Sequence, residues 1–200
     1  LLLGLFLATA CSSREALAWG RRGHQVVAGV AANLVADADS ELGFMREHGY
    51  DLAYYSNVPD LVWKKPSTYQ VEWTNHFMDL EIFARELKTK LKNKTDTGPD
   101  TGPDEGADPF TLDRVAFEAG FPNIKREAGR SWWRIRELDD RLTQIAARLK
   151  NLGESATRSE RQNLQTEWLV AAGTLGHYVG DLAQPLHCTE NYDGQLSGQK

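Results

Sequence analysis

Two long stretches in the second half of the chain carry apolar residues at every third or fourth position. They span residues 124–149 and 159–184. Because an α-helix turns once in about 3.6 residues, this spacing predicts two long amphipathic helices, and Pro185 predicts the end of the second. The apolar positions are Trp132, Trp133, Ile135, Leu138, Leu142, Ile145 and Leu149 in the first stretch, and Leu164, Trp168, Leu169, Ala172, Leu175, Tyr178 and Leu182 in the second.

The first half of the chain predicts shorter helices. In residues 24–36, larger apolar residues stand among small ones, which predicts a helix with a buried apolar face and close neighbours. Residues 41–55 predict a weaker helix, and residues 73–87 a short extended piece followed by a helix. Pro59 and Pro66 predict turns between them. The larger apolar residues of the first helix are Val26, Val27, Val30 and Leu34.

The sequence as a whole predicts one all-α domain. No stretch alternates apolar and polar residues for long enough to propose a sheet, and no repeat of solenoid length is present. Residues 94–109 read KTDTGPDTGPDEGADP, and this content of Gly, Pro and Asp predicts a low-complexity surface loop. Calcium binding by its aspartates is the alternative, but their spacing fits no calcium loop.

Composition and charge narrow the class of protein. Of the 200 residues, 41% are hydrophobic and 26% charged, as in globular domains. Lys and Arg number 23 against 28 Asp and Glu, a formal net charge of -5. This balance excludes recruitment to nucleic acid by bulk positive charge, although bound metal ions would supply a local positive field. Two cysteines exclude a disulfide-dense module or a Cys-rich zinc module.

The beginning of the chain predicts export. Residues 1–10, LLLGLFLATA, have the length and apolar character of the central region of a signal peptide. Residues 16–18, Ala-Leu-Ala, form a cleavage site, which predicts a signal peptide over 1–18 and Trp19 as the first mature residue. A loose lipobox that ends at Cys11 is the alternative. We therefore expect a secreted or periplasmic protein.

The segment HYVGDLAQPLH at residues 177–187 carries the strongest chemical signal. His177 and Asp181 are four residues apart in a predicted helix, so both side chains leave the same face. An imidazole and a carboxylate at this spacing can chelate one metal ion or bridge two, and Pro185 lets His187 turn back toward them. A capped helix with a His–Asp ion pair is the alternative.

Three further segments supply candidate ligands. In WGRRGH at residues 19–24, the free α-amine and carbonyl of Trp19 could form a chelate that His24 completes; the alternative for His24 is a histidine at the start of a helix. Asp60 in NVPDLVW and His76 in WTNHF are each ordinary when taken alone. His48 has no such context and is interpreted as a surface or helix-end residue.

Taken in order, these motifs resemble the S1/P1 nuclease family, which is related to the zinc-dependent bacterial phospholipases C. The resemblance runs from Trp19 to about residue 198. It implies a mostly helical secreted enzyme with three zinc ions that hydrolyses phosphodiesters in single-stranded DNA and RNA and removes 3′-phosphates from nucleotides. It also implies that Trp19 and His24 hold one zinc ion. A second ion would be held by Asp60, His76 and His177, with Asp181 as the bridge between the two ions and His187 as a ligand of the third.

Two departures from the family pattern qualify this expectation. Residues 94–109 look like an insertion. The family completes its third zinc site with a further histidine and a carboxylate downstream, whereas this chain ends at Lys200. The sequence therefore predicts a domain over 19–200 that is truncated at its C-terminus, with two zinc sites that have all their ligands.

The expected function follows from the resemblance. Asp60 would orient or deprotonate the attacking water, and an aromatic side chain would stack on a base. The expected partners are single-stranded DNA or RNA and nucleotides, without a membrane, and the mature chain is expected to be a monomer. The alternatives are a phospholipase C and an exported zinc-binding helical protein without catalysis. The candidates for stacking are Tyr54, Tyr55, Trp63 and Tyr69.

Overall fold

The computed structural model describes residues 20–96, 109–153 and 155–198. Within these ranges every regular element is a helix, and the one isolated β-bridge, between Met78 and Gly129, belongs to no strand. The prediction of an all-α domain is therefore confirmed. The predicted signal peptide, Trp19 and residues 97–108 of the predicted surface loop lie outside the described residues. At the ends of that loop the prediction is wrong, because residues 94–96 are helical and Pro109 begins a 3₁₀ turn. No helix among those described has both the length and the apolar character that crossing a bilayer needs.

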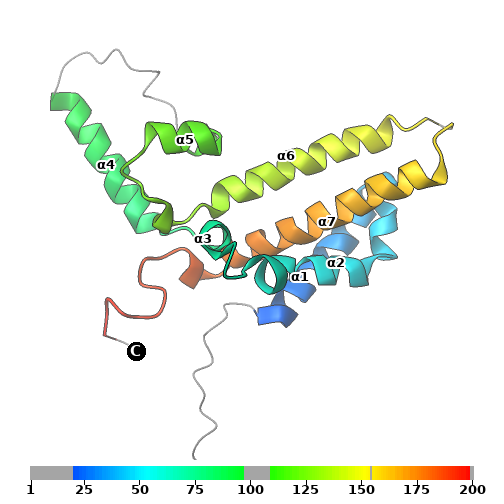
Figure 1. Cartoon of the computed structure of the whole chain (residues 1–200), viewed down its shortest axis with the longest axis horizontal. Coiled ribbons are helices and arrows are strands. Elements are labelled where there is room, and N and C mark those ends of the chain that lie inside the picture. Colours follow the sequence, from blue (N-terminus) through cyan, green and yellow to red (C-terminus); the bar gives the residue numbers. More distant parts are fainter. Residues whose placement is uncertain (1–19, 97–108, 154, 199–200) are drawn as a thin grey trace, which may run out of the picture.

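The two longest helices form an antiparallel pair that runs through the molecule (Figure 1). They are α6 (Ser131–Lys150) and α7 (Arg158–Leu182). The first turn of α7 is fixed by a capping box, in which the Thr157 hydroxyl accepts a hydrogen bond from the Glu160 amide and the Glu160 carboxylate accepts one from the Thr157 amide. The core between the pair contains Leu138, Leu142, Ile145, Leu149, Leu164, Trp168 and Leu169.

The helix predicted over residues 124–149 begins later than the sequence pattern suggests. Residues 124–130 contain only the 3₁₀ turn η5 (Arg126–Ala128). Gly129 follows it with a φ of 91°, which is outside the helical region. The buried guanidinium of Arg130 then donates hydrogen bonds to the carbonyls of Ile124 and Gly129, so this segment stays folded back on itself.

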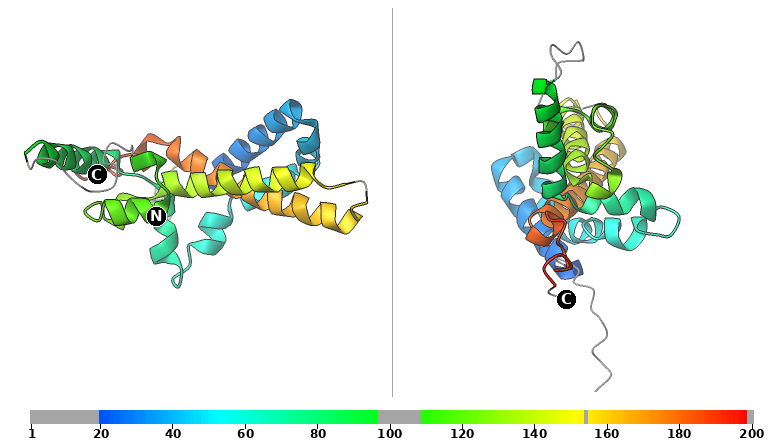
Figure 2. Two further views of the ribbon diagram at one scale, coloured as in Figure 1. Left: turned by 90° about the horizontal axis from the view of Figure 1, so that it is seen from above. Right: turned by 90° about the vertical axis from the view of Figure 1, so that its left-hand side faces the viewer.

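Shorter elements pack against one side of α7 (Figures 1 and 2). They are α1 (Gly20–Ala38), the 3₁₀ helix η1 (Ser40–Arg46) and α2 (Gly49–Tyr55). Together with the C-terminal half of α6 and with α7, they enclose the larger of two clusters of buried apolar residues. His48 stands at the N-cap position of α2 without a side-chain capping hydrogen bond and pairs with Asp51, as expected for a helix-end residue.

The buried face of α1 differs from the prediction. Val26, Val30 and Leu34 are 65%, 54% and 64% exposed. The residues that α1 buries are instead His24, Ala28, Ala32 and Ala36. Small side chains allow the backbones to approach: a Cβ built at Gly176 of α7 would lie 3.9 Å from Ala28. Close packing of α1 on α7 therefore uses the small residues, and it is this face that carries His24.

The remaining elements lie toward the other end of the molecule (Figure 1). Helices α4 (Leu80–Asp96) and α5 (Arg114–Gly120) and the turn η4 (Pro109–Thr111) surround the second buried cluster, which includes Phe83, Phe117 and Trp133. Four short elements lead into the centre of the molecule. They are the turns η2 (Pro59–Trp63) and η6 (Pro185–His187), and α3 (Tyr69–Glu72) followed directly by η3 (Trp73–His76). The extended piece predicted at the start of residues 73–87 occurs later, at Phe77, because residues 73–76 form a 3₁₀ turn.

We predict that Gly173 is required for the close contact between α2 and α7. A Cβ at this position would lie 2.5 Å from the Tyr55 Cβ and 3.2 Å from the Ser56 backbone nitrogen. Gly173→Ala should therefore lower the free energy of unfolding by about 1–3 kcal/mol, measured by chemical denaturation. Gly29→Ala in α1 is the matched control, because nothing lies within 4 Å of the added Cβ; it should be neutral or stabilising. Equal effects of both substitutions would contradict the prediction.

Candidate metal centre

Six of the residues predicted as metal ligands come together in one cluster. They reach it from five different elements: α1, η2, η3, α7 and η6. Two triads of their ligand atoms each fit within 4.8 Å: His24, His177 and Asp181, and Asp60, His76 and His177. His187 joins them, with its Nε2 3.5 Å from Oδ1 of Asp181. The seventh predicted ligand, Trp19, lies outside the described residues.

Helix α7 presents two of these ligands from one face. His177 and Asp181 are one turn apart, and the His177 Nε2 lies 3.1 Å from Oδ2 of Asp181. The other nitrogen of His177, Nδ1, lies 2.7 Å from the carbonyl oxygen of Ser56. A carbonyl can only accept, so Nδ1 carries the proton and donates. In the neutral ring Nε2 then turns a lone pair toward the cluster, as a metal ligand requires.

Two turns bring Asp60 and His76 to the same place. Asp60 lies in η2, a π-helical turn, and such turns are frequent at functional sites. Its Oδ1 lies 3.7 Å from Nδ1 of His76 and 3.9 Å from Nε2 of His177. His76 ends the 3₁₀ turn η3, and its Nδ1 lies 2.9 Å from the His177 Nε2. Residues more than a hundred positions apart in the chain therefore share one site.

The spacing of these atoms suits a tetrahedral metal ion. Nitrogen and oxygen ligands about 2.0–2.2 Å from zinc, placed at the corners of a tetrahedron, lie about 3.3–3.6 Å from one another. Among the atoms contributed by Asp60, His76, His177 and Asp181, five separations span 2.8 to 3.9 Å and bracket that value. The triad of Asp60, His76 and His177 could therefore hold a metal ion, with Oδ2 of Asp181 close to both imidazoles.

The carboxylate of Asp181 faces both halves of the cluster. Its Oδ2 lies 2.8 Å from Nδ1 of His76 and close to His177, whereas its Oδ1 lies 3.4 Å from Nε2 of His24 and close to His187. Gly180 makes room for this arrangement, because a Cβ there would lie 3.3 Å from the His24 ring. Asp181 therefore offers one oxygen to each of the two ligand groups.

The electrostatics of the cluster favour a cation. Asp181 is buried, which opposes its charge, but the close imidazoles of His177, His187 and His76 outweigh burial and hold its pKa far below the usual range. Burial and the neighbouring His177 lower the pKa of His24 to about 4, so this imidazole is neutral near pH 7. The buried Nδ1 of His24 has no hydrogen-bond partner within the described residues, and Nε2 of His76 makes no hydrogen bond of good geometry there, its near neighbour being Oε1 of Glu72 at 3.4 Å. The centre therefore holds a buried negative charge and, at His24, a neutral nitrogen ligand.

Two charged residues of the centre escaped the sequence analysis. Lys64 donates to Oδ1 of Asp60 at 2.9 Å and, despite the burial of Asp60, lowers the pKa of that carboxyl group. Glu72 lies behind His76, on the side away from the cluster. Both stand four residues from a predicted ligand, and helical side chains at this spacing can contact each other. This spacing was the sequence feature that could have identified them. The Ser56 carbonyl had no signal, because any residue has a carbonyl group.

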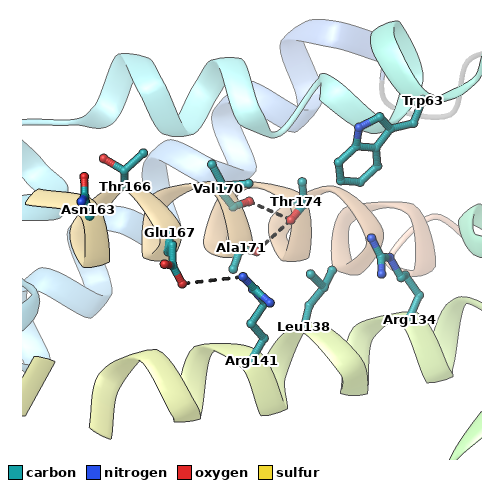
Figure 3. Close-up of a pocket in the computed structure, with 10 residues that line it drawn as sticks. All are labelled: Trp63, Arg134, Leu138, Arg141, Asn163, Thr166, Glu167, Val170, Ala171 and Thr174. Carbon is teal, nitrogen blue, oxygen red and sulfur yellow. Dashed lines mark hydrogen bonds and ion pairs between the residues drawn. The ribbon is translucent and has the colours of Figure 1, made fainter. Parts of the chain in front are cut away.

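The four aromatic candidates for base stacking have different surroundings. Tyr54 is exposed, Tyr69 stacks on Trp73, and Tyr55 packs against the larger core cluster. Trp63 lies three residues after Asp60 and lines a groove between α6 and α7 (Figure 3). The guanidinium of Arg134 lies 5.7 Å from the centre of the Trp63 ring, while farther along the groove Arg141 pairs with Glu167.

Comparison with family models, with curated proteins and with solved structures gives no match. The structure itself supports a more general statement. The buried His and Asp groups form a site that could hold a metal ion.

We predict that the affinity for a metal falls as the pH is lowered, because His76 becomes protonated. Burial opposes a charge on its ring, but the hydrogen bond to Asp181 and the nearby carboxylate of Glu72 outweigh burial and raise its pKa above the usual value. His76 therefore keeps its proton up to a higher pH than an ordinary histidine does, and this proton must leave before a metal binds. The affinity for zinc, measured by competition with a chelator, should fall about tenfold per pH unit below that raised pKa.

His24 does not contribute to this dependence, because its pKa of about 4 keeps it neutral across the range from pH 6 to 8. The loss of affinity should thus begin above pH 6.5, higher than for an ordinary histidine. His48→Gln, outside the cluster, is the control and should leave the profile unchanged. An affinity that is constant between pH 6 and 8 would contradict the assignment.

Proposed function

We propose that this protein is a zinc-dependent phosphodiesterase that hydrolyses single-stranded DNA and RNA. The observation that carries the proposal is the division of the ligands between the two oxygens of Asp181, with His76 and His177 on one side and His24 and His187 on the other. The order of the motifs in the sequence, which resembles that of the S1/P1 nucleases, adds support.

The donor set favours zinc. Imidazole nitrogens and carboxylate oxygens are its usual ligands, and the buried His-rich cluster contrasts with the all-oxygen shells of Mg²⁺ and Ca²⁺. When bound, zinc lowers the pKa of water and offsets the charge that develops on a phosphoryl group. A chain with a net charge of -5 needs such a local positive field to bind a polyanion. The proposal keeps the Trp19 α-amine as a ligand, and it keeps export and a monomeric state.

The substrate approaches from the side where ligands are partly exposed. The side chains of His187 and Asp60 are 27% and 24% exposed, whereas His177 is fully buried. Lys64, which is 28% exposed, stands beside Asp60 on this open side. Asp60 is placed to orient the attacking water and to accept its proton, and the Lys64 ammonium is placed to bind a phosphate oxygen.

Recognition of a single strand needs an aromatic surface near the scissile phosphate. Trp63 follows Asp60 by three residues and borders the groove between α6 and α7, so it is the aromatic side chain we assign to stacking on an unpaired base. Arg134 at the same end of the groove contributes positive charge. A duplex does not expose the face of its bases, so this mode of binding selects single strands.

We predict that the purified protein with zinc releases acid-soluble nucleotides from single-stranded DNA and RNA but no phosphocholine from a phosphatidylcholine emulsion. Asp60→Asn should reduce kcat by about 10²- to 10⁴-fold, because an amide cannot accept the proton of the attacking water. Asp140→Asn, on the exposed face of α6, is the control and should be fully active.

The opposite result, phosphocholine released and nucleic acid intact, would replace the nuclease by a phospholipase C. Zinc bound without either activity would indicate the non-catalytic alternative. Normal hydrolysis by Asp60→Asn would remove Asp60 from the reaction.

We also predict that Lys64 binds the phosphate and is not needed for the metal. Lys64→Met should raise KM for single-stranded DNA about tenfold, because one charge-assisted contact to a phosphate oxygen is lost. Its zinc content should not fall, since removal of a nearby cation cannot weaken the attraction of the cluster for another cation. Lys150→Met, at the far end of α6, removes the same charge and should leave KM unchanged. Equal KM values for both variants would argue against a specific contact.

A further inference from the structure

Glu72 is a buried carboxylate placed behind the metal centre. It is the last residue of α3 and is only 8% exposed. His76 follows it by four residues, and Nε2 of His76 lies 3.4 Å from Oε1 of Glu72. The opposite nitrogen of the same ring, Nδ1, faces Asp181, His177 and Asp60. Glu72 therefore contacts a predicted ligand on the nitrogen that the metal does not use.

Several groups hold Glu72 in this position. The hydroxyl of Tyr178 donates a hydrogen bond to Oε1, and the side-chain amide of Asn75 donates one to Oε2 at 3.3 Å. The guanidinium of Arg134 lies over the Tyr178 ring, 5.5 Å from its centre. A buried carboxylate without partners is strongly destabilising, and these contacts stabilise Glu72 in its charged form. An apolar residue at this position would need no such partners. Among the described ligands, it is His76 that this charge contacts.

His177 shows what such a contact does. Its Nδ1 donates to the Ser56 carbonyl, and this leaves Nε2 as the nitrogen that faces the cluster. His76 faces the cluster with the other nitrogen, Nδ1, so its Nε2 needs an acceptor in the corresponding place. Glu72 is the carboxylate within reach of that nitrogen. The two imidazoles therefore face the cluster with opposite nitrogens. The outer nitrogen of His177 contacts a neutral carbonyl, and that of His76 contacts a charged carboxylate.

We infer that Glu72 is a positioning residue of the metal centre, which accepts the Nε2 proton of His76 and so directs the Nδ1 lone pair of His76 at the metal ion. Its negative charge also makes this imidazole a stronger ligand than His177. Tyr178 acts through Glu72, because its hydroxyl fixes the carboxylate that in turn fixes the ring. The inference rests on the metal centre of the proposed function and does not depend on the substrate.

The test measures binding of zinc alone to the whole chain, by competition with a chelator. Glu72→Ala should weaken zinc binding about 10- to 100-fold, as is usual for partners of metal-bound histidines. Glu72→Gln retains an oxygen that accepts from Nε2 but loses the charge, so its affinity should be intermediate. Tyr178→Phe should also weaken binding, by less than Glu72→Ala. Glu127→Gln, an exposed carboxylate on η5, is the matched control and should bind zinc like the unmodified protein.

A second measurement separates positioning from a merely structural role. In the zinc-bound protein, ¹⁵N NMR should show His76 with a protonated Nε2 and a metal-bound Nδ1, and Glu72→Ala should lose this fixed pattern while His177 keeps its own. Thermal unfolding of the metal-free variants reports whether they fold. Variants that fold and bind zinc with unchanged affinity and an unchanged His76 pattern would overturn the inference, and so would variants that lose stability alone.

The test of Glu72 can fail independently of the test of the proposed nuclease activity. If the unmodified protein binds zinc but cleaves no nucleic acid, the proposed function fails, while the ranking of the Glu72 variants in zinc affinity still decides the inference. If nucleic acid is cleaved and the Glu72 variants bind zinc normally, the proposed function stands and the inference is wrong.

Discussion

The carboxylate of Asp181, buried among four imidazole rings, is the constraint around which the rest of the structure is arranged. A buried negative charge is stable only when positive charge or hydrogen-bond donors surround it. His24, His76, His177 and His187 all direct a nitrogen at this one group. They come from four different elements, so the site exists only when these elements are packed together. Binding of a metal ion at this site would therefore be coupled to folding.

Small residues on α7 and α1 make that packing possible. Gly173 admits α2 so closely that the carbonyl of Ser56 reaches His177, and Gly180 leaves room for the His24 ring. The alanine face of α1 lies against α7, and as a result the valines of α1 remain exposed. Hydrophobicity alone would have placed the opposite face inward. The position of His24 is thus decided by the distance between two backbones, which is a packing effect.

The chemistry of the centre resolves an apparent conflict in the composition. The chain carries a net charge of -5, yet the function we propose requires it to bind a polyanion. In the function we propose, the carboxylates of the cluster attract dications, and the bound dications would reverse the local sign of the field. Lys64 and Arg134 add positive charge on the open side of the centre and at the end of the neighbouring groove. Binding would thus depend on a local field, whatever the overall charge.

The sequence by itself determined the helical class, the two long helices and the list of candidate ligands. Periodicity reports which residues share a helical face, and His177 and Asp181 are neighbours within one helix, so both results needed only local information. The tertiary structure decided what depends on contacts between distant segments: the buried face of α1, the meeting of Asp60 with His76 and His177, and the carboxylate behind His76. Glu72 looks like any other glutamate in the sequence. Its importance comes from burial and from the hydroxyl of Tyr178, more than a hundred residues away, and a local pattern carries no record of such a contact.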